Sequence, residues 1–140
     1  MNILKFIFST KRNGMNRVFN ILGIKIKIPI DYNCSIPDQK ILKEKNIEFP
    51  HPIGIVIAEQ AKLGKNCVIF QNVTIGGKTI NGKNGFPTIG NDVTIYAGAC
   101  IIGDVKVGNN VEIGANAVVT KDVPDNCIVA GVPAKIIKRM

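Results

Sequence analysis

The chain has 140 residues, of which 46% are apolar and 20% charged, a composition typical of a single compact domain. No run of eighteen or more uncharged apolar residues occurs, so a membrane-spanning helix is excluded. The net charge of +8 is uneven, because residues 1–30 hold six basic side chains and no acid, while the rest holds twelve bases and ten acids. The nearly neutral body offers no basic stripe with interleaved aromatics, so nucleic-acid binding is not expected.

Residues 1–30 are predicted to form a basic, apolar N-terminal arm, and residues 31–140 the main domain. Two interpretations of the arm stay open. We favour a helix or strand that docks on its own protein with a solvated basic face; the alternative is peripheral contact of residues 1–28 with an anionic membrane surface. No cleavage pattern of a secretory signal follows the apolar start, so we expect a cytoplasmic protein, or one at the inner face of the membrane.

The cysteines carry no predicted chemistry. Cys34, Cys67, Cys100 and Cys127 are too far apart for a CxxC knuckle, and His51 is the only histidine. No metal site is therefore expected, and the thiols are interpreted as small apolar groups in the core.

A six-residue repeat is the most informative feature of the sequence. An aliphatic residue returns at a fixed place in ten hexads, which are headed by Ile57, Leu63, Ile69, Ile75, Ile89, Ile95, Ile101, Val107, Ile113 and Val119. A small or β-branched apolar residue follows four positions later in all of them except the hexad of Ile75, where Thr79 stands. A helix cannot satisfy a strict period of six, whereas short strands joined by tight turns can. The pattern predicts an all-β solenoid with three hexads per coil and the aliphatics inside.

The interval from Ile75 to Ile89 is fourteen residues instead of six. Residues 76–88 are rich in glycine, asparagine and lysine, and are predicted to form a loop that leaves the solenoid. A tolerated surface insertion without function is the alternative.

Four segments resemble the hexapeptide-repeat acyltransferases: residues 51–57, 73–77, 87–90 and 130–137. The resemblance covers roughly residues 30–138 and is greatest to the serine acetyltransferase branch, including its short relatives from surface-polysaccharide gene clusters. It implies a left-handed parallel β-helix with a C-terminal tail at residues 124–140. It also implies acetyl transfer from acetyl-CoA to a hydroxyl, in a homotrimer whose sites lie between subunits.

The same resemblance implies roles for individual residues. His51, which breaks the register between two prolines, matches the family's general base, and Gly76 and Gly77 are candidate oxyanion donors. The corners that receive the CoA arm are matched by Ala97, Ala115 and Thr120. The candidate partners of the CoA phosphates are Lys121, Lys135 and Lys138.

Some positions depart from the family pattern. Where the family has a carboxylate that orients the histidine, the alignment places Cys34; Asp31, Asp38, Glu59 or a backbone carbonyl are the substitutes. Two charged positions that engage serine in the serine enzymes correspond to Pro50 and to the residue before Phe86.

These departures bear on the acceptor. We expect a glycan hydroxyl, with a sugar stacked on Phe86. The alternatives are serine O-acetylation and sugar N-acetylation. A γ-type carbonic anhydrase is excluded by the single histidine, and a non-catalytic scaffold or ice-binding solenoid would not need the irregular His51 segment or the loop.

Overall fold

The structure is a computed structural model that describes residues 8–13, 16–21, 24–29 and 39–140. The chain divides into two compact units, residues 1–32 and 33–140. The described residues of the first unit form three strands, β1 (Phe8–Asn13), β2 (Asn16–Ile21) and β3 (Ile24–Pro29), which make an antiparallel meander. The predicted arm is thus a small sheet in its described part.

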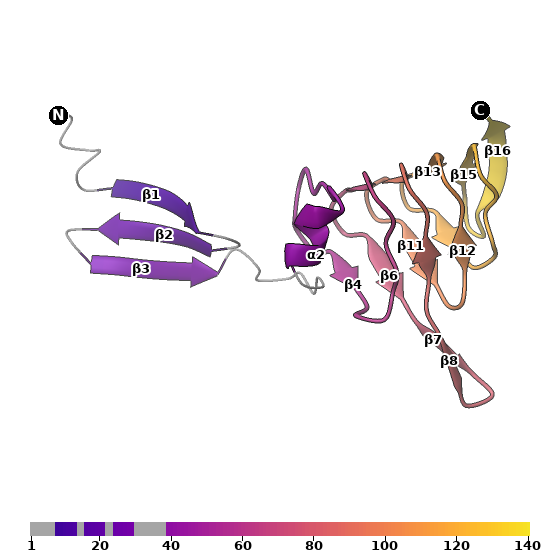
Figure 1. Ribbon diagram of the computed structural model, residues 1–140, viewed down its shortest axis with the longest axis horizontal. Helices are drawn as coiled ribbons and strands as arrows, with labels where there is room; N and C mark the ends of the chain where they lie inside the picture. The colour runs from indigo at the N-terminus through magenta and orange to yellow at the C-terminus, as the bar shows by residue number, and fades with distance from the viewer. Residues whose placement is uncertain (1–7, 14–15, 22–23, 30–38) are drawn as a thin grey trace. The chain divides into compact units, whose positions relative to one another are not determined.

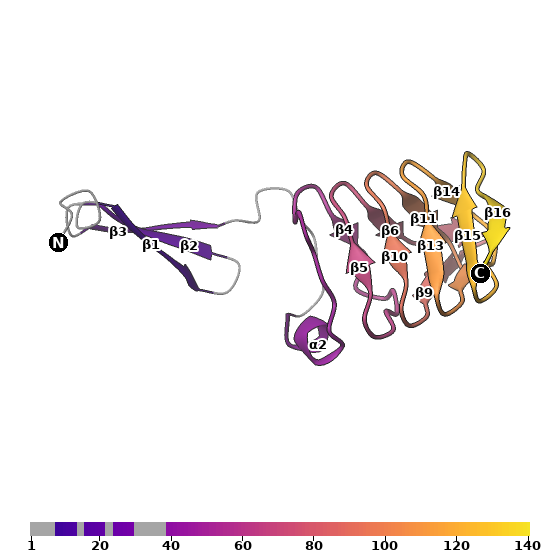
Figure 2. The same cartoon turned by 90° about the horizontal axis from the view of Figure 1, so that it is seen from above.

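The second unit begins with the short helix α2 (Gln39–Glu44) and continues as a stack of strand-and-corner coils (Figures 1 and 2). Parallel strands from successive coils pair along the stack into three sheets. The first contains β4 (Val56–Ile57), β6 (Thr74–Gly76), β11 (Cys100–Ile102) and β14 (Val118–Val119). The second contains β5 (Val68–Ile69), β10 (Thr94–Ile95), β13 (Val111–Ile113) and β15 (Cys127–Ala130). The third contains β9 (Thr88–Ile89) and β12 (Lys106–Val107). The predicted solenoid is confirmed.

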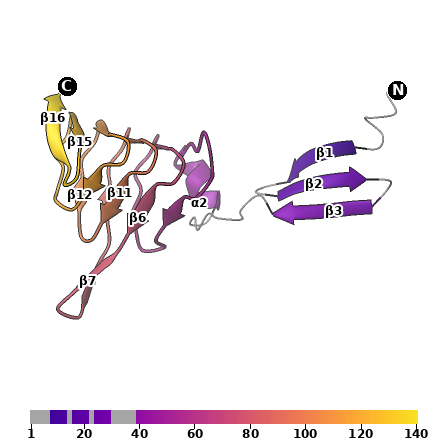
Figure 3. The same ribbon diagram turned by 180° about the vertical axis from the view of Figure 1, so that it is seen from behind.

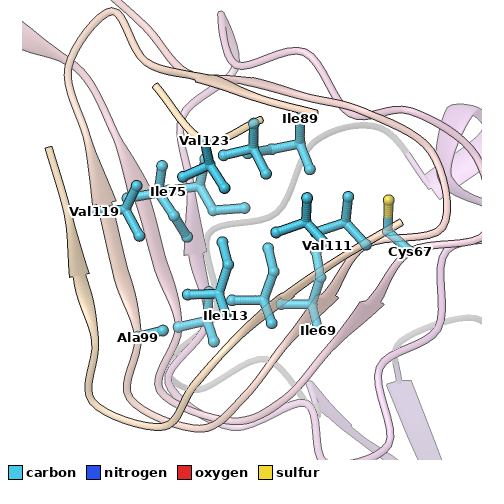
Figure 4. Packing of buried hydrophobic residues seen from close by; sticks show 14 of the residues in the cluster. Cys67, Ile69, Ile75, Ile89, Ala99, Val111, Ile113, Val119 and Val123 are labelled. Atoms are coloured by element: carbon cyan, nitrogen blue, oxygen red, sulfur yellow. The ribbon is translucent and has the colours of Figure 1, made fainter. Parts of the chain in front are cut away.

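The aliphatic ladder fills the interior of the coils (Figure 4). All ten residues that head the hexads are buried, and Ile69, Ile75, Ile95, Ile101 and Ile113 are completely inaccessible to solvent. Among residues 42–140, no polar or charged residue belongs to this buried set. Because each coil adds apolar contacts to both of its neighbours, the stack is stabilised along its whole length.

One corner of every coil is built by a residue in the left-handed backbone region. These residues are Asn46, Asn66, Asp92, Asn110 and Asn126, with φ between 53° and 56°. Asparagine and aspartate tolerate this conformation better than other residues with a side chain. Their side chains also pair along the stack, for example from Asn66 to Asp92 at 3.0 Å and from Asn110 to Asn126 at 2.8 Å.

The insertion at residues 76–88 forms a β-hairpin, not an irregular loop (Figure 3). Strands β7 (Lys78–Ile80) and β8 (Lys83–Gly85) pair antiparallel across Asn81 and Gly82, which have φ values of 50° and 74°. Positive φ at both central residues is the conformation of a type I′ turn, for which Asn-Gly is the preferred sequence. The hairpin explains why Thr79 breaks the hexad rule, since it lies outside the coils.

The predicted C-terminal tail ends the stack. Strand β16 (Lys135–Arg139) runs back along β15 and pairs with it in the antiparallel direction. The last coil before this reversal has fewer residues than the one before it. Paired residues of successive coils are eighteen positions apart at Cys100 and Val118, but only sixteen positions apart at Val111 and Cys127.

Candidate active site

The sheet of β4, β6, β11 and β14 has two edges that organise the candidate site. We call the corner that precedes its strands the entry edge, formed by Ile53, Gln71, Ala97 and Ala115. We call the positions that follow its strands the exit edge, formed by Ala58, Gly76, Ile102 and Thr120. Five positions separate Ala97 from Ile102, which at the rise of a strand is at most roughly 16 Å, and the turn at Ala97 and Gly98 shortens this distance.

His51 lies at the entry edge of the first coil. Its carbonyl oxygen accepts a hydrogen bond from the Ile53 N–H at 2.8 Å, and the Ile53 carbonyl accepts one from Asn72 N–H at 2.8 Å. These bonds fix the irregular segment to the second coil. The His51 side chain is exposed, and its imidazole makes no hydrogen bond to another residue in the described part of the chain. An accessible imidazole on an anchored backbone can take a proton from a bound ligand.

Ala97 and Ala115 continue this edge along the stack. The N–H of Asn116 donates to the Ala97 carbonyl at 2.9 Å, and the N–H of Gly98 donates to the Gln71 carbonyl at 3.0 Å. The Oε1 atom of Gln71 is buried without a hydrogen-bond partner among the described residues. Sequence analysis did not single out Gln71; the signal was a polar side chain in a column of otherwise apolar corner residues.

A pair of aromatic rings lies immediately before the entry edge. Phe70 and Tyr96 stack with ring centroids 5.5 Å apart, and the Tyr96 hydroxyl donates to Glu112 Oε2 at 3.2 Å. The neighbouring Glu112 carboxylate raises the pKa of Tyr96, and partial desolvation adds to the effect. This platform was also missed, although two aromatics follow buried isoleucines at equivalent corner positions.

At the exit edge, backbone and side chains are tightly packed. A Cβ added at Gly76 would lie 3.2 Å from Ile102 Cδ1, and one added at Gly77 would lie 2.7 Å from Phe86 Cδ1. The Phe86 ring therefore lies against Gly77 and is half-buried. Any side chain at Gly77 would displace this ring.

Two cavities lie between the hairpin and the exit edge. One has a volume of 420 Å³ and is lined by Lys78, Ile80, Ile102, Gly103, Asp104, Val105 and Thr120. The other has a volume of 360 Å³ and is lined by Lys78, Ile80, Lys83, Asn84, Gly85 and Asp104. Cavities of this size accommodate small ligands or one arm of a larger one.

Comparison with known proteins places this architecture in a family. The profile of the family described as bacterial transferase hexapeptide (six repeats) matches residues 86–121. A serine acetyltransferase of Synechococcus elongatus is 42% identical over 95 residues, which cover 68% of this chain and 39% of the relative. The structure of a Brucella abortus serine acetyltransferase in complex with coenzyme A aligns with a TM-score of 0.65 at 36% identity, covering 76% of this chain and 40% of that one. A Neisseria gonorrhoeae serine acetyltransferase in complex with serine aligns with a TM-score of 0.61 at 41% identity, covering 66% of this chain and 37% of that one.

The chain belongs to the hexapeptide-repeat acyltransferase family. It falls in the serine acetyltransferase-like branch, and its solenoid is a left-handed parallel β-helix. The chain spans only about two fifths of the length of these relatives, 39% in the Synechococcus protein.

Within this hexapeptide-repeat domain the predicted site residues fall into separate groups. His51, Ala97 and Ala115 share the entry edge. A second group lies at or beside the exit edge: Gly76, Gly77, Phe86, Thr120 and Lys121. Lys135 and Lys138 stand apart on β16, where both are exposed. Of the predicted cofactor residues, only Thr120 lines either of the two cavities described above.

The orienting partner of His51 is not found among the residues whose positions are described. Glu59 is exposed and follows the exit edge, and its carboxylate forms no hydrogen bond or ion pair with the imidazole of His51 in the structure. Cys34, Asp31 and Asp38 lie outside the described residues. The described part of the hexapeptide-repeat chain contains no group of three or more potential metal ligands and no helix long and apolar enough to span a membrane.

Proposed function

We propose that the protein is an acetyl-CoA-dependent O-acetyltransferase with His51 as its general base. The observation that carries the proposal is the exposed, anchored imidazole on a hexapeptide-repeat edge that continues along the stack through the small corner residues Ala97 and Ala115. The solved Brucella relative that holds coenzyme A supports this choice of acyl donor. The proposal retains the expected cytoplasmic location.

In the proposed reaction, His51 takes the proton of the acceptor hydroxyl as its oxygen attacks the thioester carbonyl. The tetrahedral intermediate carries an oxyanion, for which the backbone N–H groups at Gly76 and Gly77 are the proposed donors. The C–S bond then breaks, and the imidazolium returns the proton to the leaving CoA thiolate. The acceptor gains an acetyl ester, and the enzyme is regenerated.

The separation of the two edges supports a site shared between subunits. His51 is on the entry edge, whereas Gly76 and the cavities are on the exit edge, with the strands of the sheet between them. One copy holds these groups at opposite edges of the sheet, and the entry edge of one copy can face the exit edge of another. We therefore propose a homotrimer in which each site takes His51 from one subunit and the glycine pair from the next.

Two acceptors have support from different observations. The relatives are serine acetyltransferases, one of them solved with serine, and they favour the serine hydroxyl. Pro50 and Phe86 instead favour a neutral glycan hydroxyl, because neither side chain complements an amino acid zwitterion. The comparisons weigh more heavily, so serine is the first acceptor to test and the glycan hydroxyl is the second.

A thiol-release assay with acetyl-CoA tests the function directly. The acceptor panel contains serine, neutral oligosaccharides and amino sugars, and mass spectrometry identifies the acetylated atom. Turnover with serine supports the first candidate, and turnover with an oligosaccharide at oxygen supports the second. Acetylation only at the nitrogen of amino sugars, or no thiol release with any acceptor, contradicts the proposed O-acetyltransferase.

A further inference from the structure

The β7–β8 hairpin has two chemically different faces. The register pairs Lys78 with Gly85 and Ile80 with Lys83, while Thr79 pairs with Asn84. Because opposite residues of a hairpin share a face and neighbours alternate, both lysines and Ile80 lie on one face. On the other face, Thr79 and Asn84 are joined by a 2.6 Å hydrogen bond between their side chains. The strand alternation thus places all the charge of the hairpin on one side.

The charged face of the hairpin supplies most of the hairpin residues that line the cavities, and Asn84 is the one residue of the other face among them. Lys78 and Ile80 line both cavities, and Lys83 lines the 360 Å³ one. The opposite wall comes from the corner after β11, where Asp104 lines both cavities and Ile102 and Val105 line the larger one. The smaller cavity therefore combines two ammonium groups with the side chain of Ile80, and the larger one combines the Lys78 ammonium with an aliphatic surface.

The two lysines have no structural task that explains their position. All residues of β7 are exposed, and the hairpin contributes no residue to the buried core. Neither Lys78 nor Lys83 forms a side-chain hydrogen bond or ion pair with any of the residues that the structure describes. Among the residues that the structure describes, Asp104 is the only carboxylate that lines either cavity, so two ammonium groups face one carboxylate there.

From this arrangement we infer that Lys78 and Lys83 form an anion subsite that binds a carboxylate or phosphate group of a ligand. One negative charge on the ligand would neutralise the excess positive charge of the cavity walls. The apolar part of the ligand next to this charge would contact Ile80, Ile102 and Val105. Ammonium groups are natural partners of both anions, and a partly enclosed site strengthens the interaction. The inference rests on the proposed function, since the anionic group belongs either to coenzyme A or to the acceptor.

Binding measurements without turnover test the subsite. Isothermal titration calorimetry compares the intact protein with Lys78→Gln, Lys83→Gln and the double variant, each against matched ligands that differ in charge: coenzyme A and pantetheine, serine and serinamide, glucuronate and glucose. Inorganic pyrophosphate probes the subsite alone. Lys65→Gln, an exposed lysine that lines neither cavity, is the matched control, and Lys78→Arg with Lys83→Arg keeps the charge.

We expect the double Gln variant to lose about tenfold or more in affinity for pyrophosphate and for the anionic member of one pair, with its neutral member unchanged. The Arg variant and the Lys65 control should bind as the intact protein does, and added salt should weaken only anion binding. Loss for coenzyme A assigns the anion to the donor; loss for serine or glucuronate assigns it to the acceptor.

Other outcomes overturn the subsite. These are equal losses for charged and neutral ligands, wild-type affinity in the double variant, or no pyrophosphate binding by the intact protein. Absence of thiol release together with charge-dependent pyrophosphate binding would contradict the proposed function and leave the subsite standing.

Discussion

The coils and the β7–β8 hairpin are made of equally short strands, yet they use their side chains in opposite ways. In the coils every strand buries at least one aliphatic residue, as Ile95 does in β10. In the hairpin no residue is fully buried, and Ile80 is 57% exposed. The coils therefore depend on packing, whereas the hairpin depends on its turn and on what binds to it. Substitutions in the two regions should separate stability from ligand binding.

Truncation of matched isoleucines gives the largest expected contrast. Ile95→Ala should lower the free energy of unfolding by about 2–5 kcal/mol, because it leaves a cavity in a fully buried ladder. Ile80→Ala should lower it by less than about 0.5 kcal/mol, because its side chain is already in solvent. Chemical denaturation of both variants measures the difference. Equal losses of stability would show that the hairpin packs as part of the core.

Substitution of His51 tests whether a residue of the coils can affect catalysis without affecting stability. His51→Ala should reduce turnover by roughly 10²-fold or more, since it removes proton transfer. Its free energy of unfolding and its affinity for coenzyme A should stay near those of the intact protein, because the exposed side chain packs against nothing in the core. Steady-state kinetics and calorimetry separate these quantities, and near-normal turnover would make His51 structural.

Substitution of one glycine in the coils and one in the hairpin compares how tightly the backbone is packed in the two regions. A Cβ at Gly64 would overlap the Gly90 carbonyl group and lie 2.8 Å from Asn91 N, all of them backbone atoms of the next coil. A Cβ at Gly82 would meet nothing within 4 Å, and only its φ of 74° opposes substitution. Gly64→Ala should therefore cost about 3 kcal/mol and Gly82→Ala about 1 kcal/mol. Thermal unfolding of the pair gives the ranking, and the reverse order would contradict the close packing of the coils.

The buried thiol of Cys67 gives the smallest expected effect. Burial raises the pKa of Cys67, so the folded state holds its proton at pH values where the unfolded chain releases it. The free energy of unfolding should consequently fall as the pH rises above the ordinary thiol pKa of about 8.5. Denaturation from pH 7 to pH 10 should show a shallower decline in Cys67→Ala. If the decline of the free energy of unfolding with pH were the same in Cys67→Ala, other titratable groups would be its cause.

The coils and the hairpin also differ in how well the sequence predicted their structures. The hexad rule identified the buried ladder, from Ile57 to Val119, because a single period sets both the strand spacing and the burial. The length of the insertion at residues 76–88 was visible too, but its hairpin went unrecognised although Asn81-Gly82 is a strong turn signal. Counting residues between hexads located the insertion without indicating how it folds.

The candidate site was only partly accessible from the sequence. His51 was found because it breaks the register, and its position on an anchored corner fits the predicted role. Gln71, Tyr96 and the lysines of the hairpin were missed, because their interest comes from neighbours one coil away. A linear repeat gives the place of a residue within its coil, but it does not show which side chains of adjacent coils and insertions enclose a space.

The reversal of β16 has a consequence for the growth of such a stack. A parallel coil presents its last strands as a template on which a further coil, from the same or another chain, can continue. Here β16 occupies the edge of β15 in the opposite direction, and its Lys135, Lys138 and Arg139 side chains are exposed. A second molecule approaching this end meets like charges and an antiparallel register that no hexad can extend. The β16 strand thus closes the sheet of β15 against the addition of a further parallel coil, so a repetitive architecture cannot be continued end to end along this sheet.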